Sequence, residues 1–411
     1  MKRFILSLAA LAFLSCSPAI AACGDGSSAC FWIGSAGGNW NTSGNWSNTS
    51  GGSSSGTTPA TGDSICFDSA NNNNSTLNTT RSILSINTAG TCTGGSGSVY
   101  TGTITHSASV TLTVTGNDAS ANGGTTFLLS SSSGWTASNA TTSIVTFTAT
   151  SGTSTFTPNS SGASRNFGNV TFNGAGGTFK LGSTITGASA STLTLTAGTF
   201  DNNSVDLTYG AFSSSNSNTR TVTNVTGVWN LNIASPATIF DTGTSTNFTN
   251  YSTAFSGLTI NISGATVGAR SVSAGAATTI GAINLGANTS GGNFGLAAGA
   301  SSTLTITNFT ATAPSSIRFS GASSRAYTFT NSVTLTGTSS NPIGLTGDGG
   351  GSVFPVITGS FSGDYVAIGT FSFGTGTQSF TNCYNFANVT STGTLTCTPP
   401  AAGGGGGIIG G

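Results

Sequence analysis

The sequence predicts an all-β protein built as a parallel β-helix (β-solenoid), with roughly 20 to 30 residues per coil. Apolar and hydroxyl residues alternate in short bursts, as at 110–114, 193–195 and 258–262, and such alternation is typical of strands with one buried face. The bursts recur at a loose spacing, which indicates stacked units rather than one closed domain. The chain contains no Glu and few apolar residues at helical spacing, so we do not expect amphipathic helices.

The composition excludes several classes of protein. Only 4% of the 411 residues are charged, whereas ordinary globular domains contain about 25%. No apolar run beyond the N-terminus approaches the roughly 20 residues of a membrane span, and the 25 Phe and 5 Trp are too many for a disordered polar tract. Without Lys2 and Arg3, seven basic residues stand against nine Asp, so we expect no nucleic-acid partner.

The N-terminus resembles an export signal. Residues 1–22 are predicted to be a secretory signal peptide, because two basic residues precede an apolar stretch and a run of small residues. Cleavage is expected near Ala21 or Ala22, which predicts a secreted or cell-surface protein. The alternative is lipoprotein processing at Cys23, since the four residues ending there resemble a bacterial lipobox. We favour soluble secretion, because lipidation would leave Cys30 without a partner.

Six cysteines remain after cleavage, and they fall into three local pairs. An even number of cysteines in an exported chain predicts disulfide bonds. The candidate pairs are Cys23 with Cys30, Cys66 with Cys92, and Cys383 with Cys397. The middle pair is separated by about one coil, so we expect those two residues one above the other on neighbouring coils. Bonds at both ends would hold the terminal coils, which have only one neighbour.

Residues 23–60 form a distinct entry segment that is rich in tryptophan. Trp32, Trp40 and Trp46 lie within it, each close to Gly. One interpretation is an aromatic platform that contacts a sugar ring of a glycan. The other is a cap that covers the open end of the β-stack, because bare strand edges recruit other chains. We favour the cap.

Residues 61–397 are predicted to be the solenoid itself. Inward Val, Ile, Leu and Phe would stack on their equivalents in the next coil, while outward Thr and Ser would keep the surface wet. Gly and Asn would form the left-handed turns between faces. The Gly-rich residues 398–411 are expected to be a disordered tail.

The sequence contains no pattern that identifies catalytic chemistry, a cofactor or a metal. His106 is the one histidine; it lacks partners at the spacing of a catalytic triad or a metal site, and we interpret it as a surface residue. Glycan-cleaving solenoids need paired carboxylates. Asp63 and Asp68 are five residues apart, so on a strand they would face opposite sides. Asp201 and Asp206 are also five residues apart, across an Asn-Asn turn.

Several other charged residues are expected to serve turns. Asp is common in turns, where its side chain accepts backbone hydrogen bonds. The arginines lie next to turns and would satisfy turn carbonyls or solvate the surface. The Asp residues of this kind are Asp118, Asp241, Asp348 and Asp364, and the arginines are Arg165, Arg220, Arg270, Arg318 and Arg325.

The entry segment resembles a known group of proteins. Trp32-Ile-Gly, the two Gly-Asn-Trp motifs ending at Trp40 and Trp46, and the stretch from Asp63 to Asp68 resemble the opening of secreted bacterial β-helix proteins of the adhesin and autotransporter-passenger type. The repeats, such as Leu-Thr-Leu-Thr-Ala-Gly-Thr-Phe, resemble repeat-rich surface or phage-encoded proteins. The resemblance implies a fold, and no catalytic residue follows from it.

Together these observations predict an exported structural or adhesive protein without enzymatic activity. It would bind glycans or other cell or matrix surfaces through a repetitive Thr/Ser/Asn face. A β-helix polysaccharide lyase or hydrolase is one alternative, and a phage tail fibre or spike component is another. The sequence does not define an oligomeric state.

Overall fold

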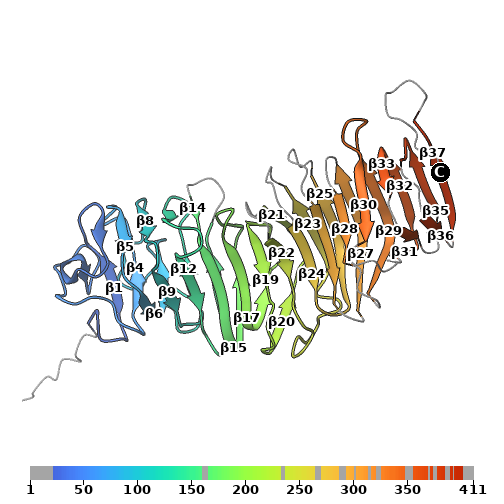
Figure 1. Ribbon diagram of the computed structural model, residues 1–411. Helices are drawn as coiled ribbons and strands as arrows, with labels where there is room; N and C mark the ends of the chain where they lie inside the picture. Colours follow the sequence, from blue (N-terminus) through green and yellow to red (C-terminus); the bar gives the residue numbers. More distant parts are fainter. Residues whose placement is uncertain are drawn as a thin grey trace, which may run out of the picture.

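The computed structural model shows an elongated parallel β-solenoid, as predicted (Figure 1). Residues 1–21 of the predicted signal peptide, Asp348 and most of the Gly-rich tail lie outside the described residues. The structure describes residues 22–159, 165–232, 237–263, 270–286, 293–299, 302–312, 316–320, 325–347, 355–368, 371–373, 377–384, 389–391 and 393–400.

The strands stack in chain order from one end of the rod to the other (Figure 1). Among the described strand pairs, β1 (Ala29–Trp32) with β3 (Trp46–Ser47) is antiparallel and every other pair is parallel. The helical part of the described chain is a single 3-10 turn, η1 (Ser43–Asn45). Across the described ranges, no helix has the length and apolarity needed to cross a membrane.

The largest sheet contains 19 strands and runs along most of the rod. Its strands are β1, β3, β4 (Ser64–Cys66), β6 (Arg81–Ile83), β7 (Ser85–Asn87), β9 (Thr111–Val114), β10 (Phe127–Leu128), β12 (Ile144–Phe147), β13 (Thr153–Thr157), β15 (Asn169–Leu181), β17 (Thr192–Asp201), β19 (Ala211–Ser213), β20 (Arg220–Thr223), β22 (Ala237–Asp241), β24 (Arg270–Ala274), β26 (Asn293–Ala298), β28 (Ser316–Phe319), β30 (Ile343–Gly347) and β33 (Val366–Ile368).

A second surface is formed by a five-stranded sheet and then by an 11-stranded sheet, with a single bridge between Phe167 and Gly187 joining them. The five-stranded sheet contains β2 (Gly38–Asn39), β5 (Ser75–Leu77), β8 (Thr103–His106), β11 (Gly134–Ala137) and β14 (Arg165–Asn166). The 11-stranded sheet contains β16 (Ile185–Thr186), β18 (Leu207–Tyr209), β21 (Val228–Leu231), β23 (Phe255–Ile262), β25 (Thr278–Leu285), β27 (Thr303–Thr312), β29 (Ala326–Thr336), β31 (Pro355–Ile357), β32 (Ser360–Asp364), β35 (Thr377–Thr381) and β37 (Thr394–Thr398); β34 (Phe371–Phe373) pairs with β36 (Val389–Ser391).

Inward side chains form continuous columns that fill the rod. In one column each residue lies beside its equivalent in the next coil: Leu112, Val145, Val170, Leu193, Phe212, Phe240, Val272, Leu296 and Phe319. All of these side chains are buried. Neighbouring strands lie about 4.8 Å apart, so each apolar group contacts its equivalents above and below, and one contiguous core results.

The coil length varies more than the sequence predicted. On the 11-stranded sheet the paired inward positions are Leu207, Trp229, Ile260, Ile283, Phe309, Val333, Phe361, Gln378 and Leu395. The step from Trp229 to Ile260 is slightly longer than 30 residues, and the last two steps are shorter than 20. The strands stay paired from coil to coil, and register shifts within strands take up part of the difference, as between Phe255 and Thr259 on β23. Asn supplies several of the left-handed turn positions, as at Asn203 and Asn224.

Candidate functional site

The tryptophan-rich entry segment is a buried cap. Trp32, Trp40 and Trp46 are at most 2% exposed, with ring centroids 5.2 Å apart for Trp32 and Trp46 and 5.5 Å for Trp40 and Trp46. Each indole N–H donates a hydrogen bond to the protein: Trp32 to the oxygen of Asn73, Trp40 to the hydroxyl of Ser75 and Trp46 to the oxygen of Trp40. The rings therefore have no free face for a sugar, and this burial corrects the interpretation of these residues as glycan contacts.

One buried carboxylate holds the start of the cap. Asp63 accepts hydrogen bonds from the backbone N–H groups of Gly24, Ser28 and Ala60 at 2.7, 3.1 and 2.9 Å. The Cys23–Cys30 disulfide lies beside it. The two sulfurs and the carboxylate are close enough to suggest a metal site, but the disulfide leaves no thiolate to act as a ligand. The disulfide and the Asp63 carboxylate together stabilise the cap.

All three predicted disulfides are present. Their Cα–Cα distances are 4.9, 6.2 and 6.0 Å for the pairs beginning at Cys23, Cys66 and Cys383. The middle pair differs in detail from the prediction: Cys66 lies beside Asn87 in the strand ladder, and its partner Cys92 lies in the turn that follows. The bond therefore joins a strand to a turn of the next coil.

His106 is buried, which contradicts its interpretation as a surface residue. Its Nε2 lies 2.9 Å from the oxygen of Val110, and its ring lies 5.6 Å from that of Trp135 in an edge-to-face arrangement. Burial lowers the pKa of His106 to about 4. Ile104 is buried two residues earlier on β8, so the period of two already places His106 inside.

The aspartates of the described chain act as braces for turns and coils. Asp118 accepts from the backbone N–H groups of Thr126 and Thr155, each at 2.9 Å. Asp68 accepts from the N–H of Ser96 in the next coil at 2.8 Å. Asp206, Asp241 and Asp364 likewise accept hydrogen bonds, from Val228, Gly243 and Asn382. These contacts agree with the predicted use of Asp in turns.

Two arginines bind backbone carbonyls inside the rod. Arg165 donates to the oxygens of Ser130 and Ser133 at 2.6 to 2.8 Å. Arg220 donates to the oxygens of Asn218 and Thr244 at 2.7 and 2.8 Å, and its guanidinium lies 5.1 Å from the ring centre of Phe248. Burial lowers the pKa of both arginines. The predicted role at turn carbonyls is confirmed for this pair, although their burial was not foreseen.

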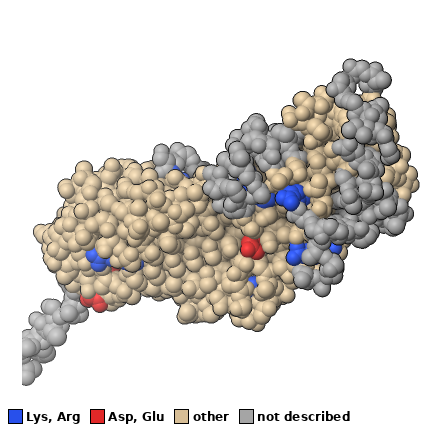
Figure 2. Space-filling model, viewed as in Figure 1, with Lys and Arg blue, Asp and Glu red and all other residues tan. Residues whose placement is uncertain are grey.

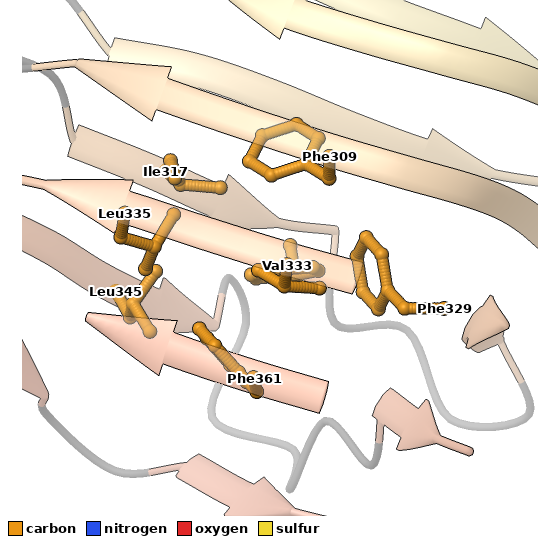
Figure 3. Close-up of a pocket in the computed structure, with 8 residues that line it drawn as sticks. Phe309, Ile317, Phe329, Val333, Leu335, Leu345 and Phe361 are labelled. Carbon is orange, nitrogen blue, oxygen red and sulfur yellow. The ribbon is translucent and has the colours of Figure 1, made fainter. Parts of the chain in front are cut away.

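A small cavity lies in the core of the C-terminal half (Figure 3). Its volume is about 10 Å³, roughly that of one water molecule, and its lining is apolar. A water molecule there would lack hydrogen-bond partners, so the cavity is a packing defect and not a ligand site. The lining residues are Phe309, Ile317, Phe319, Phe329, Val333, Leu335, Leu345 and Phe361.

The most regular surface feature is an array of hydroxyl groups on the outer face of the 11-stranded sheet. We call it the hydroxyl array. Five successive strands, β27, β29, β32, β35 and β37, each contribute three outward positions that align across the ladder. The three columns are Asn308, Ser332, Ser360, Thr377 and Thr394; Thr310, Thr334, Ser362, Ser379 and Thr396; and Thr312, Thr336, Asp364, Thr381 and Thr398. All but Asn308 and Asp364 carry a hydroxyl.

The middle column continues toward the N-terminus as a ladder of amides. Asn284 donates to Asn261, and Asn261 donates to Asn230, at 2.9 and 3.0 Å. These amides satisfy one another. Charged groups are few and scattered on the face seen in Figure 2. At the paired positions of these columns, the sheet presents neutral hydrogen-bonding groups in register over many coils, with Asp364 as the exception.

Comparisons with protein-family models, with curated proteins and with solved structures find no significant match to this chain.

Proposed function

We propose that this chain is an exported structural or adhesive protein that attaches to glycans or other extracellular surfaces through its repetitive Thr/Ser/Asn face. The observation that carries the proposal is the hydroxyl array, with its three aligned columns on five strands. Each hydroxyl would contribute a weak contact, and many contacts on one rigid sheet would act together.

The buried groups support a mechanical role for the rest of the molecule. Three disulfides close loops in the first coils and the last described coils, and disulfides persist in oxidising compartments outside the cytoplasm. The carboxylates of Asp63, Asp68 and Asp118 accept backbone hydrogen bonds. A carboxylate committed to such bonds maintains the fold and is poorly placed for acid–base chemistry.

A binding assay with a matched pair of variants tests this proposal. Thr334→Tyr places a bulky ring in the middle of the hydroxyl array, whereas Thr171→Tyr places the same ring on the 19-stranded sheet, between Thr146 and Thr194. Tyr is well tolerated in strands, so both variants should fold. On glycan arrays and cell surfaces we expect Thr334→Tyr to weaken binding severalfold and Thr171→Tyr to leave it unchanged.

Two results would contradict the proposal. The first is the absence of binding by the unmodified mature protein to any glycan, cell or matrix component. The second is release of reducing or unsaturated sugar ends when the protein is incubated with polysaccharides, because this would demonstrate a hydrolase or a lyase.

A further inference from the structure

The hydroxyl array is a two-dimensional lattice. Hydrogen-bonded strands lie about 4.8 Å apart, and alternate residues on one strand lie about 6.7 Å apart. Every array position pairs with its equivalent on the next strand, without a bulge between β29 and β37. Both spacings therefore repeat across the surface, with five positions in one direction and three in the other.

Ten of the thirteen hydroxyls of this lattice are free to bind something outside the protein, whereas those of Ser332, Thr381 and Thr396 donate to groups of the protein itself. Within the described residues, no hydrogen bond engages the hydroxyls of Thr310, Thr312, Thr334, Thr336, Ser360, Ser362, Thr377, Ser379, Thr394 and Thr398. All ten of these residues are exposed. The contrast with the amide ladder is direct: Asn230, Asn261 and Asn284 bond to one another, whereas the array turns its hydrogen-bonding capacity outward.

The chemistry of the array limits its partner. Asp364 is its one charged residue. The array therefore lacks the charges that would attract a charged polymer. No aromatic ring lies among the array positions, so hydroxyl and methyl groups are the contacts that the array offers. Most array residues are Thr, which places a methyl group beside each hydroxyl. Such a surface matches a neutral solid whose hydrogen-bonding atoms repeat at similar distances.

Ice is a solid of this kind. Its oxygen atoms form a lattice with repeats close to both spacings of the array, and each oxygen both donates and accepts hydrogen bonds, as a Thr hydroxyl does. The methyl groups would fill the spaces between lattice waters. The strands hold the hydroxyls in place before binding, so little conformational entropy is lost on contact. We propose that the hydroxyl array is an ice-binding surface.

Among the described strands of the 19-stranded sheet, the aligned outward positions that we compare with the array lack its combination of exposure and neutrality. On the 19-stranded sheet, Lys180 lies between Thr155 and Asp201, so charges interrupt the lattice. Thr146, Thr171 and Thr194 form a neutral column there, but they are only half-exposed. The ice-binding activity should therefore be confined to the C-terminal part of the 11-stranded sheet. This inference goes beyond attachment to glycans or cells and does not depend on it.

The test uses the mature protein and the same two variants. The freezing point, the melting point and the shape of single ice crystals are measured, together with the partition of protein into a slowly growing ice front. We expect the unmodified protein to separate freezing from melting, to facet the crystals and to enter the ice. Thr334→Tyr should reduce the difference between the melting point and the freezing point about tenfold, whereas Thr171→Tyr should leave this difference unchanged.

Three results would overturn the inference. Crystals that grow as round discs, with no gap between freezing and melting, would show that the array does not bind ice. Equal losses in Thr334→Tyr and Thr171→Tyr would show that the array is not the site. Binding to crystalline cellulose or chitin above the freezing point, without any effect on ice, would assign the array to a polysaccharide; this result would leave the proposed adhesive function intact.

Discussion

Burial of the single histidine predicts a specific loss of stability in acid. The ordinary pKa of 6.5 falls to about 4 in His106, chiefly because burial disfavours the charged imidazole. At pH 7 neither the folded nor the unfolded chain binds this proton. Between pH 6.5 and pH 4 mainly the unfolded chain binds it. The free energy of unfolding therefore decreases as the pH is lowered through this range. One pKa unit corresponds to about 1.36 kcal/mol, so this difference gives about 3 kcal/mol.

A variant isolates this contribution from that of the carboxylates. His106→Leu replaces the imidazole with a side chain like that of Leu77, its neighbour in the ladder. The carbonyl of Val110 keeps the hydrogen bond from Ile144 at 3.0 Å, so no buried acceptor is left unpaired. We compare the free energy of unfolding in urea at pH 7 and at pH 4. Between these two pH values, we expect the free energy of unfolding of the variant to decrease by about 3 kcal/mol less than that of the unmodified protein.

A direct measurement accompanies the unfolding data. The chain has one histidine, so NMR titration of a protein without a histidine tag follows His106 alone. A midpoint near 6.5, or the same pH dependence of unfolding in both proteins, would refute the reasoning. Because coils of a solenoid can unfold separately, the unfolding should be followed by the fluorescence of tryptophans, which include Trp135 beside the imidazole.

Three further predictions concern the framework. Replacing Cys66 and Cys92 with Ser should lower the free energy of unfolding by about 3.5 kcal/mol, the chain-entropy value for a loop of 26 residues; an unchanged thermal midpoint would count against it. Arg220→Lys should destabilise the protein by about 2 kcal/mol, because an ammonium group cannot reproduce the guanidinium fork; calorimetry checks this, and an equal midpoint would contradict it. Trp46→Ala should cost about 3 to 5 kcal/mol and expose the cap to limited proteolysis; resistance equal to that of the unmodified protein would show that the cap does not depend on packing.

Much of the architecture could be predicted from residue periodicity. Alternation of apolar and polar residues with a period of two predicts which side chains face inward. A loose repeat predicts a stack of coils, because a unit with one apolar face needs neighbours on both sides. The same alternation also predicts that Arg220 is buried, since Val222 two residues later is apolar. Arginine is usually exposed, so its residue type points the other way. Here backbone carbonyls in the turns accept hydrogen bonds from the guanidinium, which makes its burial possible.

The hydroxyl array could not be predicted, because it depends on register between coils of unequal length. Thr334 lies opposite Thr310 and Ser362, but the intervening turns differ in length and hide this alignment in the sequence. The tryptophans are ambiguous for another reason. A Gly-rich, Trp-rich segment is compatible with a sugar platform and with a cap, and only packing against Phe67 distinguishes them.

The low charge of the chain follows from the same stacking that aligns the array. Equivalent side chains lie one strand apart, at about 4.8 Å, and two like charges at that distance repel by about 1 kcal/mol in water and by several times more near the protein surface. A charged column would add this repulsion at every coil. Hydroxyl and amide groups add none, and amides can bond along the column, as Asn230 and Asn261 do. Lys180 fits the rule, since its partner in the ladder is Asp201, of opposite charge. A solenoid surface that is polar yet uncharged is therefore a consequence of register, and the neutrality of the array needs no separate explanation.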